Sequence, residues 1–301
     1  MYTEISKNKR NSWFLIGGFV IVITLLCYVF ALAFNNQAVL YLGVGFAVFY
    51  AAISYYFADS MILAVSKAQK IAKKDNPQLY RTVENLSITA GLPMPSIYII
   101  DDTAPNAFAT GRDPKHAIVA VTSGLLEKLD KPELEGVIAH ELSHVGNYDV
   151  RLMALVVVLV AVIVLLSDWF LRFSFIFGDD NDSGGGTFQL IMIVIGIALA
   201  LLAPLIGVLL QLAISRKREY LADASGAMLT RYPEGLAKAL RKIEGDTEPL
   251  EAANRATENL YIINPLRDNV HGHRSWFAGL FSTHPPTAER IKRLESMDLH
   301  P

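Results

Sequence analysis

Two histidines and a glutamate stand close together in the chain, at a spacing that suits metal chemistry. They belong to the run His140-Glu141-Leu142-Ser143-His144. On a helix, residues four apart lie one turn apart on the same face, so His140 and His144 can bind one Zn²⁺ ion. Glu141 is turned by about 100° around the helix, which leaves it free to act on a water molecule as a general base. The run therefore predicts a zinc site beside a proton-accepting carboxylate.

An amphipathic helix with incidental histidines is the competing interpretation. The rest of the run is apolar, with Val137, Ile138 and Ala139 before the first histidine and Leu142 inside the motif. Such a helix is expected to be buried, and buried ionisable groups need a partner or a metal. We therefore favour the metal site.

A catalytic zinc ion needs a third protein ligand and one open coordination position. Glu219 and Asp223 are four residues apart, and they can supply a ligand and a carboxylate that orients a liganding histidine. Taken alone, Glu219 could equally be the ion-pair partner of Arg216 on a solvated helix face. Together with the upstream motif, the ligand interpretation is favoured. His273 and His284 are the alternative third ligands.

The motif needs a helix to position it, and the sequence predicts one from Lys131 to about Tyr148. Asp130 and Glu133 form a capping-box pattern at its start. Further helices are expected to begin near Ser215, Pro233 and Pro285, and 244–254 is expected to be a charged loop.

The segment before the motif predicts mixed α/β structure. A helix is expected from Pro77 to a stop at Gly91. Residues 96–100 and 117–122 are short, β-branched and bounded by turn residues, as strands are. Residues 106–111, between those strands, have small side chains and polar ends, which disfavour a core strand.

Long apolar stretches flank these polar segments, at residues 13–34, 38–58, 152–177 and 188–214. About 20 apolar residues cross the hydrocarbon core of a bilayer, so the first, second and fourth stretches predict membrane spans. Asp168 and Arg172 interrupt the third, which either spans or lies with the fourth as a hydrophobic hairpin at the interface. Ala31-Leu32-Ala33 resembles a signal-peptide cleavage site, but the long apolar run and the closely following second stretch favour an uncleaved anchor.

The composition agrees with spans added to a globular domain. Of the 301 residues, 52% are hydrophobic and 19% are charged, and the mean hydropathy is +0.33. A soluble domain usually has about a quarter charged residues. The net charge of −2 argues against a general nucleic-acid binder, and the single cysteine, Cys27, excludes a disulfide framework.

Basic residues predict the orientation of the spans. They precede the first stretch, follow the second, open the third and follow the fourth, as Lys7, Lys9, Arg10, Lys67, Lys70, Lys73, Lys74, Arg151, Arg216, Lys217 and Arg218. The turn at 178–186, between the third and fourth stretches, is acidic and glycine-rich. The positive-inside rule then places both termini and both polar segments in the cytoplasm.

The sequence also bears on two function classes other than an enzyme. A transporter is disfavoured, because outside the third stretch the expected spans carry no ionisable residue of the kind that ion pathways need. A catalytically silent scaffold that has kept the fold would be favoured by the loss of the base or of the third ligand. Both Glu141 and Glu219 are present.

The chain resembles the HtpX family of membrane zinc metalloproteases, which is related to the CaaX prenyl proteases. The resemblance covers nearly the whole chain, and its matching elements are Asn106 to Gly111, His140 to His144 with Asn147 and Asp149, Glu219 with Asp223, and Ser282 to Pro286. It implies a multi-pass α-helical membrane protein with a cytosolic α+β metalloprotease domain that is zincin-like (gluzincin) and split by a hydrophobic hairpin. The expected parts are a two-helix anchor (1–62), the first part of the catalytic domain (63–150), the hairpin (151–214) and the second part of the domain (215–301).

The resemblance also implies a function and roles for residues. It implies a zinc-dependent endopeptidase of the cell membrane that acts on misfolded membrane proteins, with one Zn²⁺ per chain. His140, His144 and Glu219 would be the ligands and Glu141 the base. Asn106, Ala107, Phe108 and Ala109 would lie in an edge strand that pairs with extended substrate. His284, which by itself reads as a cap or surface residue, would donate to the developing oxyanion.

Overall fold

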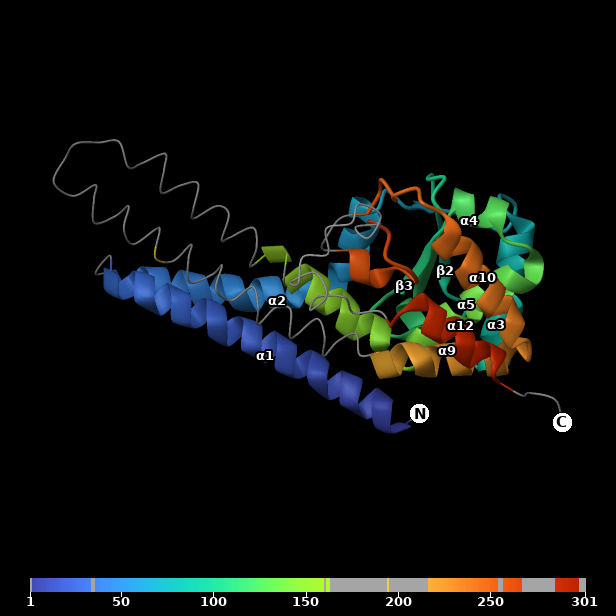
Figure 1. Cartoon of the computed structure of the whole chain (residues 1–301). Coiled ribbons are helices and arrows are strands. Elements are labelled where there is room, and N and C mark those ends of the chain that lie inside the picture. The colour runs from blue at the N-terminus through green and yellow to red at the C-terminus, as the bar shows by residue number, and fades with distance from the viewer. Residues whose placement is uncertain are drawn as a thin grey trace.

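Two long helices extend from a mixed α/β domain (Figure 1). The computed structural model describes residues 2–33, 36–159, 161–162, 194, 216–253, 257–266 and 285–297. Most of the expected hairpin lies outside the described residues, including Asp168, Arg172 and the acidic turn. The alternative ligands His273 and His284 lie outside them as well.

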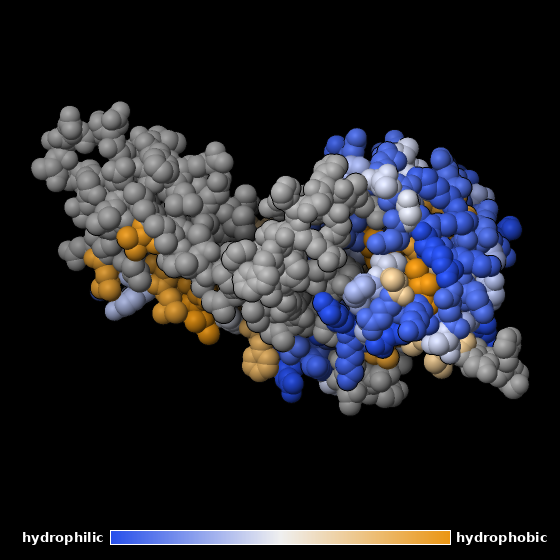
Figure 2. All heavy atoms as spheres, in the orientation of Figure 1, coloured by the Kyte–Doolittle hydropathy of each residue, from blue (hydrophilic) through white to orange (hydrophobic). Residues whose placement is uncertain are grey.

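The two long helices are α1 (Tyr2–Ala33) and α2 (Ala38–Val65), which lie side by side. Both are long and apolar enough to cross a membrane. Their outer faces carry large apolar side chains that are more than half exposed, among them Trp13, Phe14, Ile21, Leu25, Tyr41, Leu42 and Phe49. Figure 2 shows the contrast between this apolar surface and the hydrophilic surface of the α/β domain. A lipid environment accounts for such exposure, which is unusual in soluble monomers.

The α/β domain contains a four-stranded sheet in the order β1-β2-β4-β3, formed by β1 (Gln69–Lys70), β2 (Ser96–Ile100), β3 (Ala107–Thr110) and β4 (Ile118–Thr122). Strands β2 and β4 are parallel, and the two outer strands are antiparallel to their neighbours. The strands expected at 96–100 and 117–122 are therefore present, and β3 lies at one edge of the sheet.

Residue types disfavoured a core strand at 106–111, whereas the family resemblance implied an edge strand there, and β3 is such an edge strand. All four residues of β3 are buried. The polar residue at its start is accommodated because the Asn106 amide donates to Ile263 O at 2.9 Å, while its Oδ1 accepts from Ala107 N at 3.1 Å. The partner Ile263 is 157 residues away in the sequence, so the local pattern did not contain this information.

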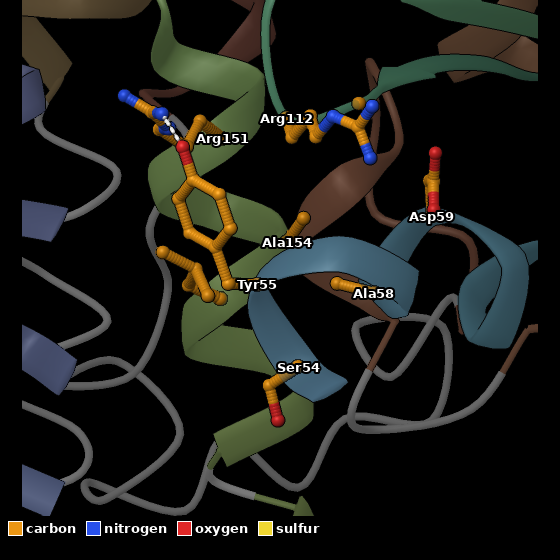
Figure 3. A pocket seen from close by; sticks show the side chains of 9 residues that line it. Ser54, Tyr55, Ala58, Asp59, Arg112, Arg151 and Ala154 are labelled. Carbon is orange, nitrogen blue, oxygen red and sulfur yellow. Dashed lines mark hydrogen bonds between the residues drawn. The ribbon is translucent and has the colours of Figure 1, made fainter. Parts of the chain in front are cut away.

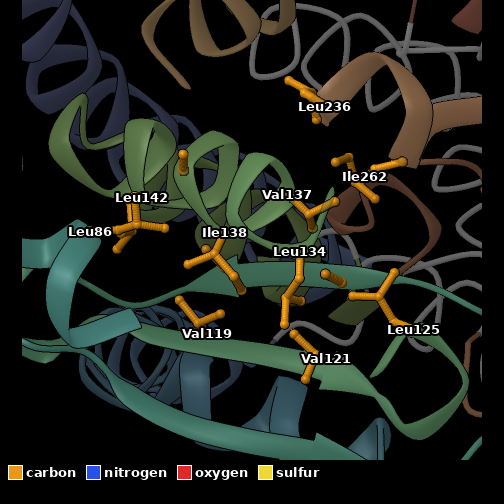
Figure 4. Close-up of a cluster of buried hydrophobic side chains, with 14 of the residues drawn as sticks. Leu86, Val119, Val121, Leu125, Leu134, Val137, Ile138, Leu142, Leu236 and Ile262 are labelled. Atoms are coloured by element: carbon orange, nitrogen blue, oxygen red, sulfur yellow. The ribbon is translucent and has the colours of Figure 1, made fainter. Parts of the chain in front are cut away.

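Helix α5 (Lys131–Gly146) lies at the centre of the domain and carries the histidine motif. It packs against α3 (Pro77–Ala90), α9 (Arg216–Thr230) and α10 (Pro233–Gly245), while α12 (Thr287–Glu295) packs on α10 and α9. The short α4 (Ser123–Lys128) follows β4, and 3₁₀ turns occur at Pro114–His116 and Glu258–Leu260. Figure 4 shows the core between α5 and the sheet, where Ile138 and Leu134 lie near Val119 and Val121, while Leu142 lies beside Leu86 of α3.

Local signals at the helix ends account for their positions. The Asp130 side chain accepts from Glu133 N, and Glu133 Oε2 accepts from Asp130 N, which is the expected capping box. Asn76 caps α3, and Gly91 ends it at φ 66° in the left-handed region that glycine tolerates.

The motif helix ends two residues earlier than expected. Helix α5 stops at Gly146, and Tyr148 adopts a left-handed φ of 61°. A second helix, Asp149–Leu159, then leaves at an angle of 80° to α5. Its residues from Leu152 onward are buried among apolar side chains of α1 and α2. The bend directs the chain from the α/β domain onto the pair of long helices.

Candidate metal centre

The structure brings the three expected ligands together. Nε2 of His140 lies 3.2 Å from Nε2 of His144. The Glu219 carboxylate lies 3.8 Å from His140 Nε2 and 3.5 Å from His144 Nε2. One ligand atom from each residue falls within 4.8 Å of the others, and all three residues are buried.

The donor set and its spacing fit a zinc ion. Zinc is bound by imidazole nitrogens and carboxylate oxygens at about 2.0–2.2 Å, so two ligands at tetrahedral angles lie roughly 3.3 Å apart. The separation of 3.2 Å between the histidine nitrogens agrees with this value. Two imidazoles and one carboxylate leave one tetrahedral position, as a catalytic site requires.

Close packing of α9 on α5 positions Glu219 beside the histidines. A Cβ atom at Gly226 would lie 3.0 Å from the backbone nitrogen of His140. Glycine at this position therefore allows the two helix backbones to approach closely. Because Glu219 and Gly226 are seven residues apart, they lie on the same face of α9. The approach at Gly226 thus presents the Glu219 carboxylate to α5.

Each histidine is held at Nδ1 by its own aspartate. Asp223, one turn after Glu219, lies 3.0 Å from His140 Nδ1. Asp149, from the corner after α5, lies 3.1 Å from His144 Nδ1. A carboxylate on the second ring nitrogen fixes the tautomer and orientation of a metal-binding histidine. Both histidines are thus oriented with Nε2 toward the cluster.

A buried arginine from α12 completes the surroundings of His140. Arg290 Nε and Nη2 lie 2.9 and 2.7 Å from the two oxygens of Asp223. The same guanidinium donates to Ile262 O at 2.9 Å and lies 3.5 Å from Glu219 Oε2. Burial acts to raise the pKa of Asp223, but the charge of Arg290 outweighs it and the pKa is lowered. Asp223 is therefore ionised in the core.

The two histidines have opposite pKa shifts. Burial lowers the pKa of His140 below its usual value. Burial acts in the same direction on His144, but its hydrogen bond to Asp149 and the nearby charge of Glu219 outweigh it and raise the pKa to about 9. A metal ion must displace a proton from such a histidine before it can bind.

Glu141, the residue that the sequence predicts as the base, is buried. It is 2% exposed, and burial raises its pKa to about 7, while the backbone N–H of Ala109 acts to lower it. A carboxylate with this pKa can accept and return a proton near neutral pH. Ala109 belongs to β3, so the base and the edge of the sheet are in contact.

Residues of β3 differ in what they present. Thr122 N–H donates to Asn106 O, and in an antiparallel pair the bonding residues alternate. Ala107 and Ala109 therefore direct their backbone groups away from β4. At Ala107 this edge is occupied, because Ala107 O accepts from Ile262 N at 3.0 Å. Phe108 points into the core, where its ring packs edge-on against Tyr261 at 5.1 Å.

A small hollow lies between α2 and the helix Asp149–Leu159, apart from the three candidate ligands (Figure 3). Ser54, Tyr55 and Ala58 of α2 face Arg151 and Ala154 across it. The Arg151 guanidinium donates to the Tyr55 hydroxyl, which ties the two helices together. The hollow thus marks the contact between α2 and the helix Asp149–Leu159, and none of its lining residues belongs to the buried group His140, His144 and Glu219.

Sequence reasoning gave no role to Arg290 or Asp149, although both touch carboxylates or histidines of the cluster. Asp149 follows His144 by only five residues, and the turn through Tyr148 folds it back. Arg290 is 150 residues from His140, so the local sequence gives no sign of this contact.

The chain matches the model of Peptidase family M48 over residues 73–298. It is 49% identical to a protein named Protease HtpX homolog from Tropheryma whipplei, over 99% of this chain and 98% of the relative. Proteins of the same name from Dictyoglomus thermophilum and Lactobacillus acidophilus are 46% and 44% identical, over 98% and 99% of this chain and 94% and 100% of the relatives.

The fold is similar to a solved structure. The crystal structure of S. mikatae Ste24p superposes with a TM-score of 0.52 and 19% sequence identity. The match covers 98% of this chain and 67% of that one. At this level of identity the likeness concerns the fold alone.

Proposed function

Because the chain belongs to peptidase family M48 and is a membrane metalloprotease, we propose that it is a zinc endopeptidase whose ligands are His140, His144 and Glu219 and whose general base is Glu141. One observation carries the proposal. Two imidazoles and a carboxylate from two helices converge in a buried cluster, and a carboxylate whose pKa is about 7 lies one residue from a ligand.

When bound, a zinc ion polarises the scissile carbonyl and acidifies a water molecule. Glu141 would accept a proton from the attacking water as its oxygen bonds to the carbonyl carbon, and would deliver that proton to the amine nitrogen as the C–N bond breaks. Asp223 and Asp149 keep the two imidazoles oriented throughout. His284 remains the proposed donor to the developing oxyanion; it lies outside the described residues.

Substrate is proposed to pair with β3 as an extended strand, by the β-augmentation mode. Supporting this, Ala109 turns its backbone groups away from β4, and its N–H faces Glu141. A peptide on this edge would pass directly beside the base. Since Ile262 occupies the edge at Ala107, the pairing would begin at Ala109, and Asn106 and Phe108 would support the strand from within.

The setting of the enzyme is also a proposal. The basic flanks of the apolar stretches support a cell-membrane protein with a cytoplasmic catalytic domain and both termini in the cytoplasm. The hairpin 151–214 is proposed to supply a third and a fourth span. The relatives named Protease HtpX homolog support a role in the quality control of misfolded membrane proteins.

The test is metal analysis of the full chain purified in detergent, alongside cleavage of an unstructured protein. We expect one zinc per chain and loss of cleavage with a chelator. Glu219→Ala should lower zinc occupancy strongly, whereas Asp223→Ala should weaken zinc binding by about 10- to 100-fold, as is typical of partners that orient a ligand. Full zinc content in Glu219→Ala would remove this residue from the ligand set. Cleavage that survives complete zinc removal would overturn the zinc mechanism.

A further inference from the structure

The first turns of α1 reach the α/β domain before the apolar part of the helix begins. Asn8 is fully buried there. Its side-chain nitrogen donates to Asn147 O at 2.9 Å and to Asp149 Oδ1 at 2.7 Å, across 139 and 141 residues of sequence. Both partners are acceptors, so only the amide nitrogen of Asn8 can satisfy them. The Asn8 side chain, in the first turns of α1, is thus hydrogen-bonded to the corner after α5, which is formed by residues 147–149.

The same aspartate leads on to a proposed metal ligand. Asp149 Oδ2 lies 3.1 Å from Nδ1 of His144, while Oδ1 receives Asn8 and lies 3.3 Å from Arg218 Nη1. A continuous path of hydrogen bonds therefore runs from α1 through Asp149 to His144. The orientation of a liganding imidazole depends on its carboxylate partner, and that partner in turn depends on its own bonds.

The corner itself is strained and is held from both long helices. Tyr148 adopts a left-handed φ of 61°, a conformation that persists when surrounding contacts impose it. Lys9 of α1 lies over the Tyr148 ring at 4.3 Å from its centroid. Arg151, three residues on, is bonded to Tyr55 of α2 (Figure 3). These contacts fix the position from which Asp149 reaches His144.

We propose that Asn8 is a positioning residue of the metal centre, through which the N-terminal membrane helix fixes Asp149 and thereby the ligand His144. This inference rests on the proposed function, since it takes His144 as a ligand. Helix α1 would then do more than attach the domain to the membrane, because it would also position a residue of the metal site. Displacement of α1 from the domain should then weaken metal binding directly.

The experiment measures zinc affinity of the full chain in lipid nanodiscs by competition with a chromogenic chelator. Asn8→Ala should raise the zinc dissociation constant by about 3- to 10-fold, less than loss of a direct partner of the ligand. Asn11→Ala is the matched control, because Asn11 lies on the same helix and its side chain has no hydrogen bond among the described residues. Cleavage by Asn8→Ala should fall at limiting zinc and return in excess zinc with KM unchanged.

Exchanging the amide and the carboxylate between residues 8 and 149 distinguishes two roles of Asn8. One is to position Asp149, and the other is only to hold α1 against the domain. Asn8→Asp places a second carboxylate against Asp149 and should bind zinc less tightly than Asn8→Ala. Adding Asp149→Asn lets residue 149 donate to residue 8 while its amide oxygen still accepts from His144. The double variant should therefore bind zinc more tightly than Asn8→Asp alone.

The outcomes distinguish this inference from the proposed function. Equal zinc affinity in Asn8→Ala and Asn11→Ala would overturn the inference and leave the peptidase intact. If Asn8→Ala does not fold, the exchange decides, and a double variant no tighter than Asn8→Asp overturns the inference. A wild-type chain that binds no zinc would instead overturn the proposed function.

Discussion

Among single residues, Arg290 is the one on which the buried charges of the cluster depend. It is 1% exposed and neutralises Asp223 through two hydrogen bonds. A buried carboxylate left without its partner costs far more than an exposed pair contributes. Arg290 thus stabilises the fold and, through Asp223, keeps His140 in its orientation.

Replacing this arginine tests the role. Arg290→Leu should lower the free energy of unfolding by about 3–5 kcal/mol, because the buried carboxylate of Asp223 loses its cationic partner and keeps only its contact with His140. Arg293→Leu is the control, since Arg293 pairs with Glu289 on the same helix with about half of its side chain exposed, and should cost roughly 1 kcal/mol or less. Denaturant unfolding in detergent measures both. Equal losses in the two variants would show that Arg290 is not needed to neutralise the cluster.

Residue types and spacing predicted the members of the cluster that lie on one helix face. His140, Glu141 and His144 follow from helical geometry alone, and Glu219 with Asp223 follows from the need for a third ligand. The partners Asn8 and Arg290 did not follow, because they reach the cluster from more than a hundred residues away. A polar residue ahead of an apolar stretch and an arginine in a charged helix carry no local sign of burial.

At the scale of elements, the edge of β3 beside α5 decides whether the site can hold an extended peptide. Ala109 N–H faces the base, while the neighbouring edge at Ala107 is filled by Ile262. Under the proposed function, a substrate strand would therefore begin to pair at Ala109. The Ala109 N–H belongs to the backbone, so substitutions of the Ala109 side chain that keep this N–H should be tolerated.

Ala109→Pro removes this N–H without removing a bond to β4. Ala109 is buried and its N–H faces Glu141, so zinc content and the unfolding transition of the variant are compared with those of the wild type. The kcat/KM of the variant should fall by at least about tenfold, since the variant loses the N–H beside Glu141 as well as one or two hydrogen bonds to substrate worth roughly 0.5–1.5 kcal/mol each. Ala109→Gly keeps the N–H and should retain most activity. Unchanged kcat/KM in the proline variant would exclude pairing at this edge.

Elements were predictable where their stabilising signals are local. The capping box at Asp130 and Glu133 and the stop at Gly91 are present as expected. Strand β3 was expected from the family resemblance and not from residue types, because the partner of Asn106 lies in the segment around Ile263. The end of α5 was placed too late, since the left-handed turn at Tyr148 is imposed by contacts with α1 rather than by its own residue type.

For the whole molecule, the resemblance to the HtpX family is confirmed by relatives that match nearly the full length. The helices α1 and α2 present apolar side chains outward and attach to the domain at the corner after α5. The buried side chains of His140, His144 and Glu219 therefore lie close to the helices that are expected to enter the bilayer.

The proposed orientation can be tested with single cysteines in a Cys27→Ser background. Cysteines at Glu127 and Glu234, both exposed on the α/β domain, should react with an impermeant thiol reagent only in inverted vesicles. A cysteine at Asp180 should react from the outside if the hairpin crosses the bilayer. Cytoplasmic labelling at Asp180 would show that the hairpin does not cross. Labelling of the cysteine at position 127 from the outside would contradict the cytoplasmic placement of the domain.

The central claim is that Glu141 moves the proton in a reaction centred on the His140, His144 and Glu219 cluster. Glu141→Gln leaves the three ligands in place and removes the proton acceptor. The most direct measurement is therefore zinc content and cleavage rate of this variant, determined on one preparation beside the wild type. The account predicts unchanged zinc and a rate lower by at least about 10²-fold, the usual contribution of a general base. Full zinc content with a rate near that of the wild type would contradict it.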